Sequence, residues 1–375
     1  MSNAFLSVAE IAKESLLRLR NNLVMRELVY SDHSGEYAQK GDTVNVRMPA
    51  TFQAEDFSSS ISEQAVKEGA VPVKLDRIAD VSVDITSKEL TLNVQDFGFQ
   101  VAEGAMQALA QKIDADLLEL YADIPYVAGG ATPGNLPNAL ADIAGARQVL
   151  NEQGAPFGNR SAVWNPATEA NLIILDAIVG ADKSGSTAAL REAAVGRVLG
   201  FENYMGQNVH THTKGTLAIQ DGKTEILPDG AHTAGATTLK LKQVENGGKA
   251  VKGDLIDIAG KGRFVVTAES AAAASNKVEL SVYPALPVLA GTEAVTLVDS
   301  HVANLAFHRN AFAFVNRPMA LPLGGAAGAV ETFEGISLRV TMGYAMLSKK
   351  NTISFDVLYG CKTLQPELAC RVWRQ

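Results

Sequence analysis

Residues 83–123, VDITSKELTLNVQDFGFQVAEGAMQALAQKIDADLLELYAD, change their hydrophobic period half-way along. The first part alternates apolar and polar residues, which is typical of a β-strand, because successive side chains of a strand point to opposite faces. From Phe97 on, apolar residues recur every three to four positions, which predicts a helix of about 24 residues, roughly 36 Å long. Neither part carries a catalytic pattern, so a long strand and a longer helix serve a surface without chemistry.

Three acidic residues near the end of this helix, Asp114, Asp116 and Glu119, are the candidates for acid–base catalysis. The helical period puts them on or near the polar side, and no histidine accompanies them. We therefore interpret them as part of a solvated helix face.

A long polar connection separates two further strands. Residues 43–48 and 79–86 both alternate apolar and polar side chains, which predicts two half-buried strands that pair with each other. The roughly thirty residues between them are polar and poorly periodic, and a connection of that length is uncommon in a compact monomer. We expect a projecting β-hairpin.

The N-terminal segment predicts an amphipathic helix. Ser7 and Glu10 form a capping-box pattern, and Leu16, Leu19 and Leu23 fall on one stripe. Because this helix precedes any folded core, its stripe needs a cover, which is either a neighbouring subunit or the body of its own chain. The segment has no basic n-region, so we expect no secretory signal.

The middle of the chain predicts a mixed α/β domain. The helix 139–153 ends at Gly154, as a C-terminal cap would, and residues 161–165 predict a short strand. Asn165 and Pro166 then supply an N-cap and a first-turn proline for the next helix.

From about Ile226 to Asp299 the chain predicts short alternating strands separated by turns, with a hairpin turn at Gly260-Lys261-Gly262. This pattern indicates a small all-β barrel or sandwich inserted in the larger domain. Near the C-terminus, residues 336–342 and 353–359 predict two long strands joined by a basic turn. We expect their apolar faces to pack against one side of the long helix.

Bulk composition limits the function classes. The chain has 375 residues, 47% of them hydrophobic and 20% charged, so it can bury a sizeable core in roughly two or three domains. The formal net charge of −8 argues against a nucleic-acid reader, which needs a basic face. Two cysteines, Cys361 and Cys370, exclude a disulfide framework. No apolar run approaches the ~18 residues of a membrane helix, so we expect a soluble, unexported protein.

The strongest catalytic candidate is a pair of histidines in NVHTHTKG. His210 and His212 lie two apart and would share one face of a strand, as a metal pair with Asp221 as a third ligand. An H-x-H pair alone is a weak signal, and a polar strand end is the favoured interpretation. Neither a phosphate-binding loop nor a G-x-S-x-G elbow occurs. We expect no enzyme, no cofactor and no metal.

Four stretches, taken in order, resemble a known family. They are IAKESLLRLRNNLVMRELV with GDTVNVRMPATF; VDITSKELTLNVQDF; AAVGRVLGFENYMGQNVHTHTKG; and NLAFHRNAFAFVNRPM with GISLRVTMGYAMLSKKNTISFDVLYG. The chain resembles the major capsid (coat) proteins of tailed bacteriophages, which have the Hong Kong 97 type fold. More narrowly, it resembles the coat proteins of short-tailed Salmonella-type phages, which carry an inserted β-barrel.

The resemblance implies an α+β chain with five parts. These are an N-terminal arm (1–40), an extended β-hairpin loop (41–96), a peripheral domain with a spine helix (97–129 and 306–375), an axial domain (130–225 and 300–305) and an inserted β-barrel domain (226–299). The arm, the loop and the basic turn would contact neighbouring subunits. The candidate contact residues are Leu16, Leu19, Leu23, Arg18, Arg20, Lys67, Lys74, Lys349 and Lys350.

The implied function is self-assembly. Copies of the chain would form pentamers and hexamers of an icosahedral shell, first a procapsid and then the mature head, around double-stranded DNA. A scaffolding protein and a portal protein would be partners, in the host cytoplasm during assembly and in the virion afterwards. Two alternatives stay open: an encapsulin-like nanocompartment shell protein, and a metal-dependent enzyme that uses His210 and His212.

Overall fold

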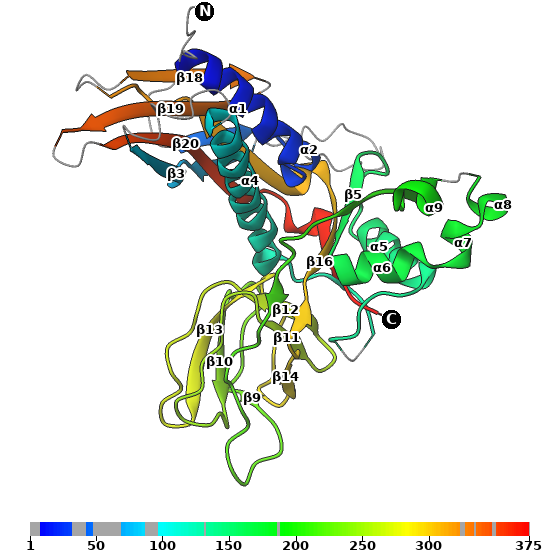
Figure 1. Ribbon diagram of the computed structural model, residues 1–375. Helices are drawn as coiled ribbons and strands as arrows, with labels where there is room; N and C mark the ends of the chain where they lie inside the picture. Colours follow the sequence, from blue (N-terminus) through cyan, green and yellow to red (C-terminus); the bar gives the residue numbers. More distant parts are fainter. Residues whose placement is uncertain are drawn as a thin grey trace, which may run out of the picture. The chain divides into compact units, whose positions relative to one another are not determined.

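The computed structural model describes residues 8–31, 43–47, 69–86, 97–130, 133–185, 188–322, 327–333, 335–346 and 350–374. The chain divides into two compact units (Figure 1). Unit 1 comprises Met1–Asp114 and Ala313–Leu364, and unit 2 comprises Ala115–Phe312 and Gln365–Gln375. Both units mix helices and strands. In the described part of the chain, no helix is both long and apolar enough to span a bilayer.

The helices of unit 1 lie near the N-terminus and in the middle of the chain. They are α1 (Val8–Asn22), α2 (Met25–Leu28) and α4 (Phe97–Leu118). The predicted long helix is confirmed, with 22 residues in α4, and a 3₁₀ turn, η1 (Glu119–Asp123), continues it. Leu109 and Ile113 on its apolar stripe are buried, as the period of 3.6 residues requires.

The main sheet of unit 1 has the strand order β17-β20-β19-β18, and β3 pairs with β20. Its strands are β3 (Arg77–Thr86), β17 (Phe312–Arg317), β18 (Ala327–Phe333), β19 (Ile336–Ala345) and β20 (Lys350–Thr363). The two long C-terminal strands predicted from alternation are confirmed, since β19 and β20 pair antiparallel and bury Leu338 and Phe355.

The predicted pairing of the two early strands is wrong. β1 (Thr43–Arg47) pairs with β2 (Ala70–Lys74), and β3 pairs with β20 instead. β2 was not predicted from the sequence, because Pro72 weakens its strand pattern. The partner of β3 is distant in sequence, with Val81 opposite Phe355, and alternation alone does not identify such a partner.

Unit 2 is built on a mixed sheet with the strand order β4-β21-β16-β5-β7-β6. Its strands are β4 (Val127–Ala128), β5 (Arg160–Trp164), β6 (Arg197–Val198), β7 (Phe201–Met205), β16 (Asn304–His308) and β21 (Ala369–Val372). The C-terminal strand β21 lies between β4 and β16. Residues 365–375 therefore belong to unit 2 and not with residues 313–364, which differs from the division that the resemblance implied.

In unit 2, the end of the first helix and the start of the second lie where the sequence predicts, but the second helix, predicted to run to Val179, ends at Ile173. α5 (Leu140–Glu152) is followed by Gly154, whose φ is +74°, a conformation that glycine adopts without strain. The side chain of Asn165 accepts a hydrogen bond of 2.8 Å from the amide of Thr168 and so caps α6 (Pro166–Ile173). Three shorter helices follow: α7 (Asp176–Val179), α8 (Ala181–Ser184) and α9 (Ala188–Glu192).

A second sheet of unit 2, which we call the 227–297 sheet, has the strand order β14-β11-β12-β13-β10-β9. Its strands are β9 (Leu227–Pro228), β10 (Thr238–Lys242), β11 (Leu255–Ile258), β12 (Gly262–Val266), β13 (Lys277–Tyr283) and β14 (Val295–Leu297). A bridge between Ile226 and Val295 joins its two edges, so the sheet closes around an apolar interior that includes Leu239, Leu241 and Leu280. The predicted strands and the hairpin between β11 and β12 are confirmed.

Candidate functional site

The apolar stripe of α1 is covered by its own chain. Leu16, Leu19 and Leu23 are at most 5% exposed, and α1 lies against β18 and β19 (Figure 1). Of the two covers left open by the sequence, the body of the same chain is therefore the one observed. The expectation that these three leucines contact a neighbouring subunit is corrected, because β18 and β19 already occupy their surface. Leu17, by contrast, is 55% exposed.

The two candidate arginines of α1 also have partners within unit 1. Arg18 donates to Glu103 on α4 at 2.8 Å and lies 3.3 Å from Glu14. The guanidinium of Arg20 lies over the ring of Phe333, 5.4 Å from its centroid. Both side chains stay about one-third exposed, at 30% and 34%, so a role in subunit contact stays a prediction for them.

The candidate lysines fall on strand ends or outside the described residues. Lys74 is exposed at the end of β2, and Lys350 at the start of β20 lies 3.6 Å from Asp84 of β3. Lys67 and Lys349 lie outside the described residues. Beside Lys74, a Cβ added to Gly360 would lie 2.2 Å from the Lys74 carbonyl oxygen, so β2 touches the backbone of β20 where only glycine fits.

Asp114 is not part of a solvated face, as the sequence suggested, but is buried. Its carboxylate accepts hydrogen bonds from the amides of Val24 and Met25, at 2.9 and 3.1 Å, and so satisfies the first amides of α2. Burial raises the pKa of Asp114 to about 6, although the two amides favour the ionised form. Asp116 is buried as well, and only Glu119 is exposed as predicted.

The two histidines of the metal-enzyme alternative have separate partners within the protein. His212, in β8 (Thr211–His212), uses both ring nitrogens on protein groups: Nδ1 lies 3.0 Å from the hydroxyl of Tyr121, and Nε2 lies 2.9 Å from Asp254. His210 contacts the carbonyl oxygen of Ala115, and Asp221 is exposed. Among the residues that the structure describes, no three His, Cys, Asp or Glu side chains could hold a metal ion.

A buried polar cluster surrounds His212. Directly opposite it on β15 (His301–Val302) lies His301, whose Nδ1 is 2.9 Å from the carbonyl oxygen of Asp299 and whose Nε2 is 3.3 Å from Nη1 of Arg371. The Arg371 guanidinium is fully buried over the ring of Tyr121, at 5.0 Å. Burial lowers the pKa of His301 to about 4 and that of Arg371 to about 9.

We call Tyr121, His212, Asp254, His301 and Arg371 the neck cluster, because β8 and β15 lead the chain into and out of the 227–297 sheet. Only His212 among these residues is a candidate from the sequence. The other members lie far apart in the sequence and belong to no motif. The alternating pattern around His212 is the one signal that it faces inward.

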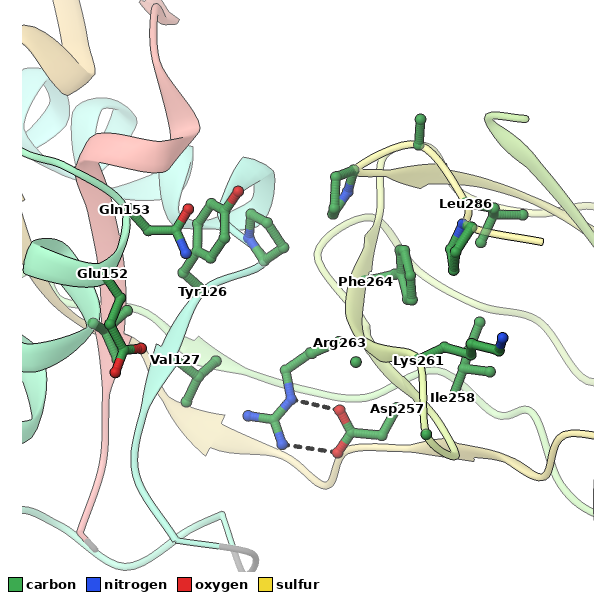
Figure 2. A pocket seen from close by; sticks show the side chains of 17 residues that line it. Tyr126, Val127, Glu152, Gln153, Asp257, Ile258, Lys261, Arg263, Phe264 and Leu286 are labelled. Atoms are coloured by element: carbon green, nitrogen blue, oxygen red, sulfur yellow. Dashed lines mark hydrogen bonds and ion pairs between the residues drawn. The ribbon is translucent and has the colours of Figure 1, made fainter. Parts of the chain in front are cut away.

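A groove of about 820 Å³ separates the 227–297 sheet from β4 and α5. Figure 2 shows Tyr126 and Gln153 on one wall and Phe264 and Arg263 on the other, with Arg263 bound through two contacts of 2.6 and 2.8 Å to Asp257. No histidine, cysteine or serine is among the residues that line this groove.

No protein-family model matches the chain, and no curated protein matches it significantly. Among solved structures, it is similar to one from Mycobacterium phage Che8, with a TM-score of 0.53 and 16% identity over 93% of this chain and 90% of that chain. The fold is of the Hong Kong 97 type.

Two further phage structures are similar at lower TM-scores. The capsid structure of the Cyanophage P-SCSP1u gives a TM-score of 0.49 and 12% identity, over 94% of this chain and 88% of that chain. The asymmetric unit of the bacteriophage PhiM1 mature capsid gives 0.43 and 12%, over 92% and 86%.

Proposed function

We propose that the chain is the major capsid protein of a tailed phage, a subunit without catalytic activity that self-assembles into an icosahedral shell. The observation that carries this proposal is the fold shared with the structure from Mycobacterium phage Che8 over 93% of the chain. A similarity of that extent leaves little of the chain for a separate catalytic domain.

The geometry of unit 1 supports the same function. α4 has 22 residues and β20 has 14, so they extend over roughly 33 Å and 46 Å at the usual rise per residue. Long strands and a long helix give a stiff plate. A shell subunit needs such extended elements, because each copy has to reach several neighbours.

Finer features of the proposal follow the family resemblance. The 227–297 sheet would be the inserted β-barrel domain of the short-tailed phage type, and its closure through Ile226 and Val295 supports this. Residues 1–40 would be the arm and residues 41–96 the extended loop. Pentamers and hexamers would form the shell with a scaffolding protein and a portal protein, in the host cytoplasm, before the virion is complete.

The net charge supports the enclosure of double-stranded DNA without specific binding. With a formal charge of −8, the subunit repels phosphate backbones within about one Debye length, roughly 8 Å at physiological salt. A packaged genome would then slide along the inner wall during filling. Expansion of the procapsid would be a switch between two packings of the same subunit.

Electron microscopy of the purified chain tests the proposal, with the chain expressed alone and together with its scaffolding protein. We expect closed shells, or plates of hexamers and pentamers. A lone monomer at every protein and salt concentration would refute the proposal. Shells that copurify with one defined enzyme instead of DNA would identify the chain as a nanocompartment protein.

A further inference from the structure

Two short paired strands attach the 227–297 sheet to the rest of unit 2. β8 leads into the sheet and β15 leads out of it, and His212 and His301 are directly opposite each other in this pair. Both histidines are 2% exposed, and their ring centroids are 5.3 Å apart. Two neighbouring buried imidazoles are costly to protonate together, because each charge lacks water and repels the other.

The hydrogen bonds of His301 determine its protonation state. Its Nδ1 lies 2.9 Å from the carbonyl oxygen of Asp299 and so has to donate. Its Nε2 lies 3.3 Å from Nη1 of Arg371 and has to accept, since a guanidinium carries only donors. His301 is therefore neutral in this arrangement. A proton on Nε2 would place a second donor and a second positive charge next to Nη1 of Arg371.

The partners of His212 differ in kind from those of His301. Its Nε2 faces the Asp254 carboxylate and its Nδ1 faces the Tyr121 hydroxyl, and both partners can accept a hydrogen bond. Asp254 also accepts from the amides of Gly215 and Val251, at 3.1 and 2.8 Å. This carboxylate is thus engaged on the His212 side and does not offset a charge on His301.

The other charged groups that face His301 oppose its protonation. Arg371 on β21, His212 on β8 and Arg263 on β12 all lower the pKa of His301, in addition to burial. Asp123 in η1 pairs with Lys252 at 2.9 Å, and the carboxylate of Asp299 pairs with Lys214 at 2.6 Å. No element packed against the neck therefore supplies a negative charge directed at His301 among the contacts described.

We propose that the neck cluster is an acid-sensitive lock, in which a proton on His301 breaks its hydrogen bond from Arg371 and loosens the attachment of the 227–297 sheet to the mixed sheet. The groove of about 820 Å³ between the 227–297 sheet and β4 and α5 gives the sheet room to tilt. The inference concerns one subunit and does not rest on the proposed shell.

Contacts away from the neck would hold the sheet less tightly once the lock opens. Arg263 lies over the ring of Trp373 at 5.4 Å, Tyr283 donates to Glu367, and Lys252 pairs with Asp123. None of these contacts involves His301, so they keep the sheet tethered when the lock opens.

Hydrogen exchange measured by mass spectrometry on the full chain tests the lock, at pH 7 and pH 5 with correction for the intrinsic rate. With a folded pKa of about 4 and a value near 6.5 in the open form, opening of residues 208–215 and 298–303 should increase roughly 20-fold from pH 7 to pH 5. His301→Gln, whose side-chain oxygen still accepts from Arg371, should abolish this increase.

His308→Gln is the matched control. His308 is buried on β16, accepts from the amide of Asn310 and also has a lowered pKa, but it lies outside the neck cluster. This variant should keep the acid response of the neck. Equal acceleration in His301→Gln, or no acceleration in the wild type, would overturn the proposal. NMR titration of His301 in the wild-type chain is independent of variant folding, and a titration midpoint above about 6 would overturn it as well.

Discussion

Burial shifts Asp114 and His301 in opposite directions because their charged forms differ. The pKa of Asp114 rises to about 6, since burial penalises the carboxylate, and the pKa of His301 falls to about 4, since burial penalises the imidazolium. Asp114 belongs to unit 1 and His301 to unit 2. Both side chains are therefore mainly neutral at about pH 5, but acid affects the two units differently.

The sign for Asp114 follows from linkage. Its folded pKa of about 6 exceeds the unfolded value near 3.9, so the folded form binds protons first and its contribution to stability is lost as the pH rises through 6. The free energy of unfolding of unit 1 should rise by about 1 kcal/mol from pH 7 to pH 5. Asp114→Asn should remove this rise. Urea unfolding at pH 7 and pH 5 measures this rise, and hydrogen exchange of the Val24 and Met25 amides reports on the contact with Asp114. An unchanged dependence of the unfolding free energy on pH in the variant would contradict the prediction.

At the scale of elements, α1 offers a direct test of what covers its stripe. Leu19→Ala should lower the free energy of unfolding of the dissociated subunit by about 2–5 kcal/mol, because a buried leucine leaves a cavity. Leu17→Ala on the exposed side of the same helix should change it by less than about 0.5 kcal/mol. Urea unfolding measures both. A stable Leu19→Ala subunit that fails to assemble would show that the stripe meets a neighbouring copy.

Elements specified by local sequence were predictable, and elements specified by distant partners were not. The length of α4, the Asn165 cap and the hairpin between β11 and β12 depend on residues a few positions apart, and all three are confirmed. The pairing of β3 with β20 joins segments at opposite ends of the chain. Nothing in the alternation of either strand identifies its partner, so the predicted hairpin pairing was wrong.

At the scale of the whole molecule, the order of the four family-like stretches predicted the fold, whereas the neck cluster was not predicted. Its members come from η1, β8, β15, β21 and the loop before β11. Polar residues in alternating strands read as surface residues unless a partner is known, and only the fold brings these five together. The burial of Asp114 was not predicted for the same reason, since its partners are backbone amides of another helix.

Assembly of a shell from acidic subunits should depend on salt. Each copy carries a formal charge of −8, so subunits repel one another, and raising the ionic strength to about 0.15 M shortens the Debye length to about 8 Å. The yield of shells from the chain alone should therefore increase between low and physiological salt. Light scattering measures the yield, and a yield that falls with salt would show that ion pairs between copies dominate.

Gly360 restricts how the β1–β2 pair can rearrange during such assembly. The Lys74 carbonyl oxygen occupies the space that a side chain would need at this position. If β2 moved along β20 by two residues, the Lys74 carbonyl oxygen would face Leu358 or Lys362. Both of these residues have a Cβ atom. The glycine thus opposes sliding of β2 along β20, so the register of this contact should stay fixed in any motion of the pair.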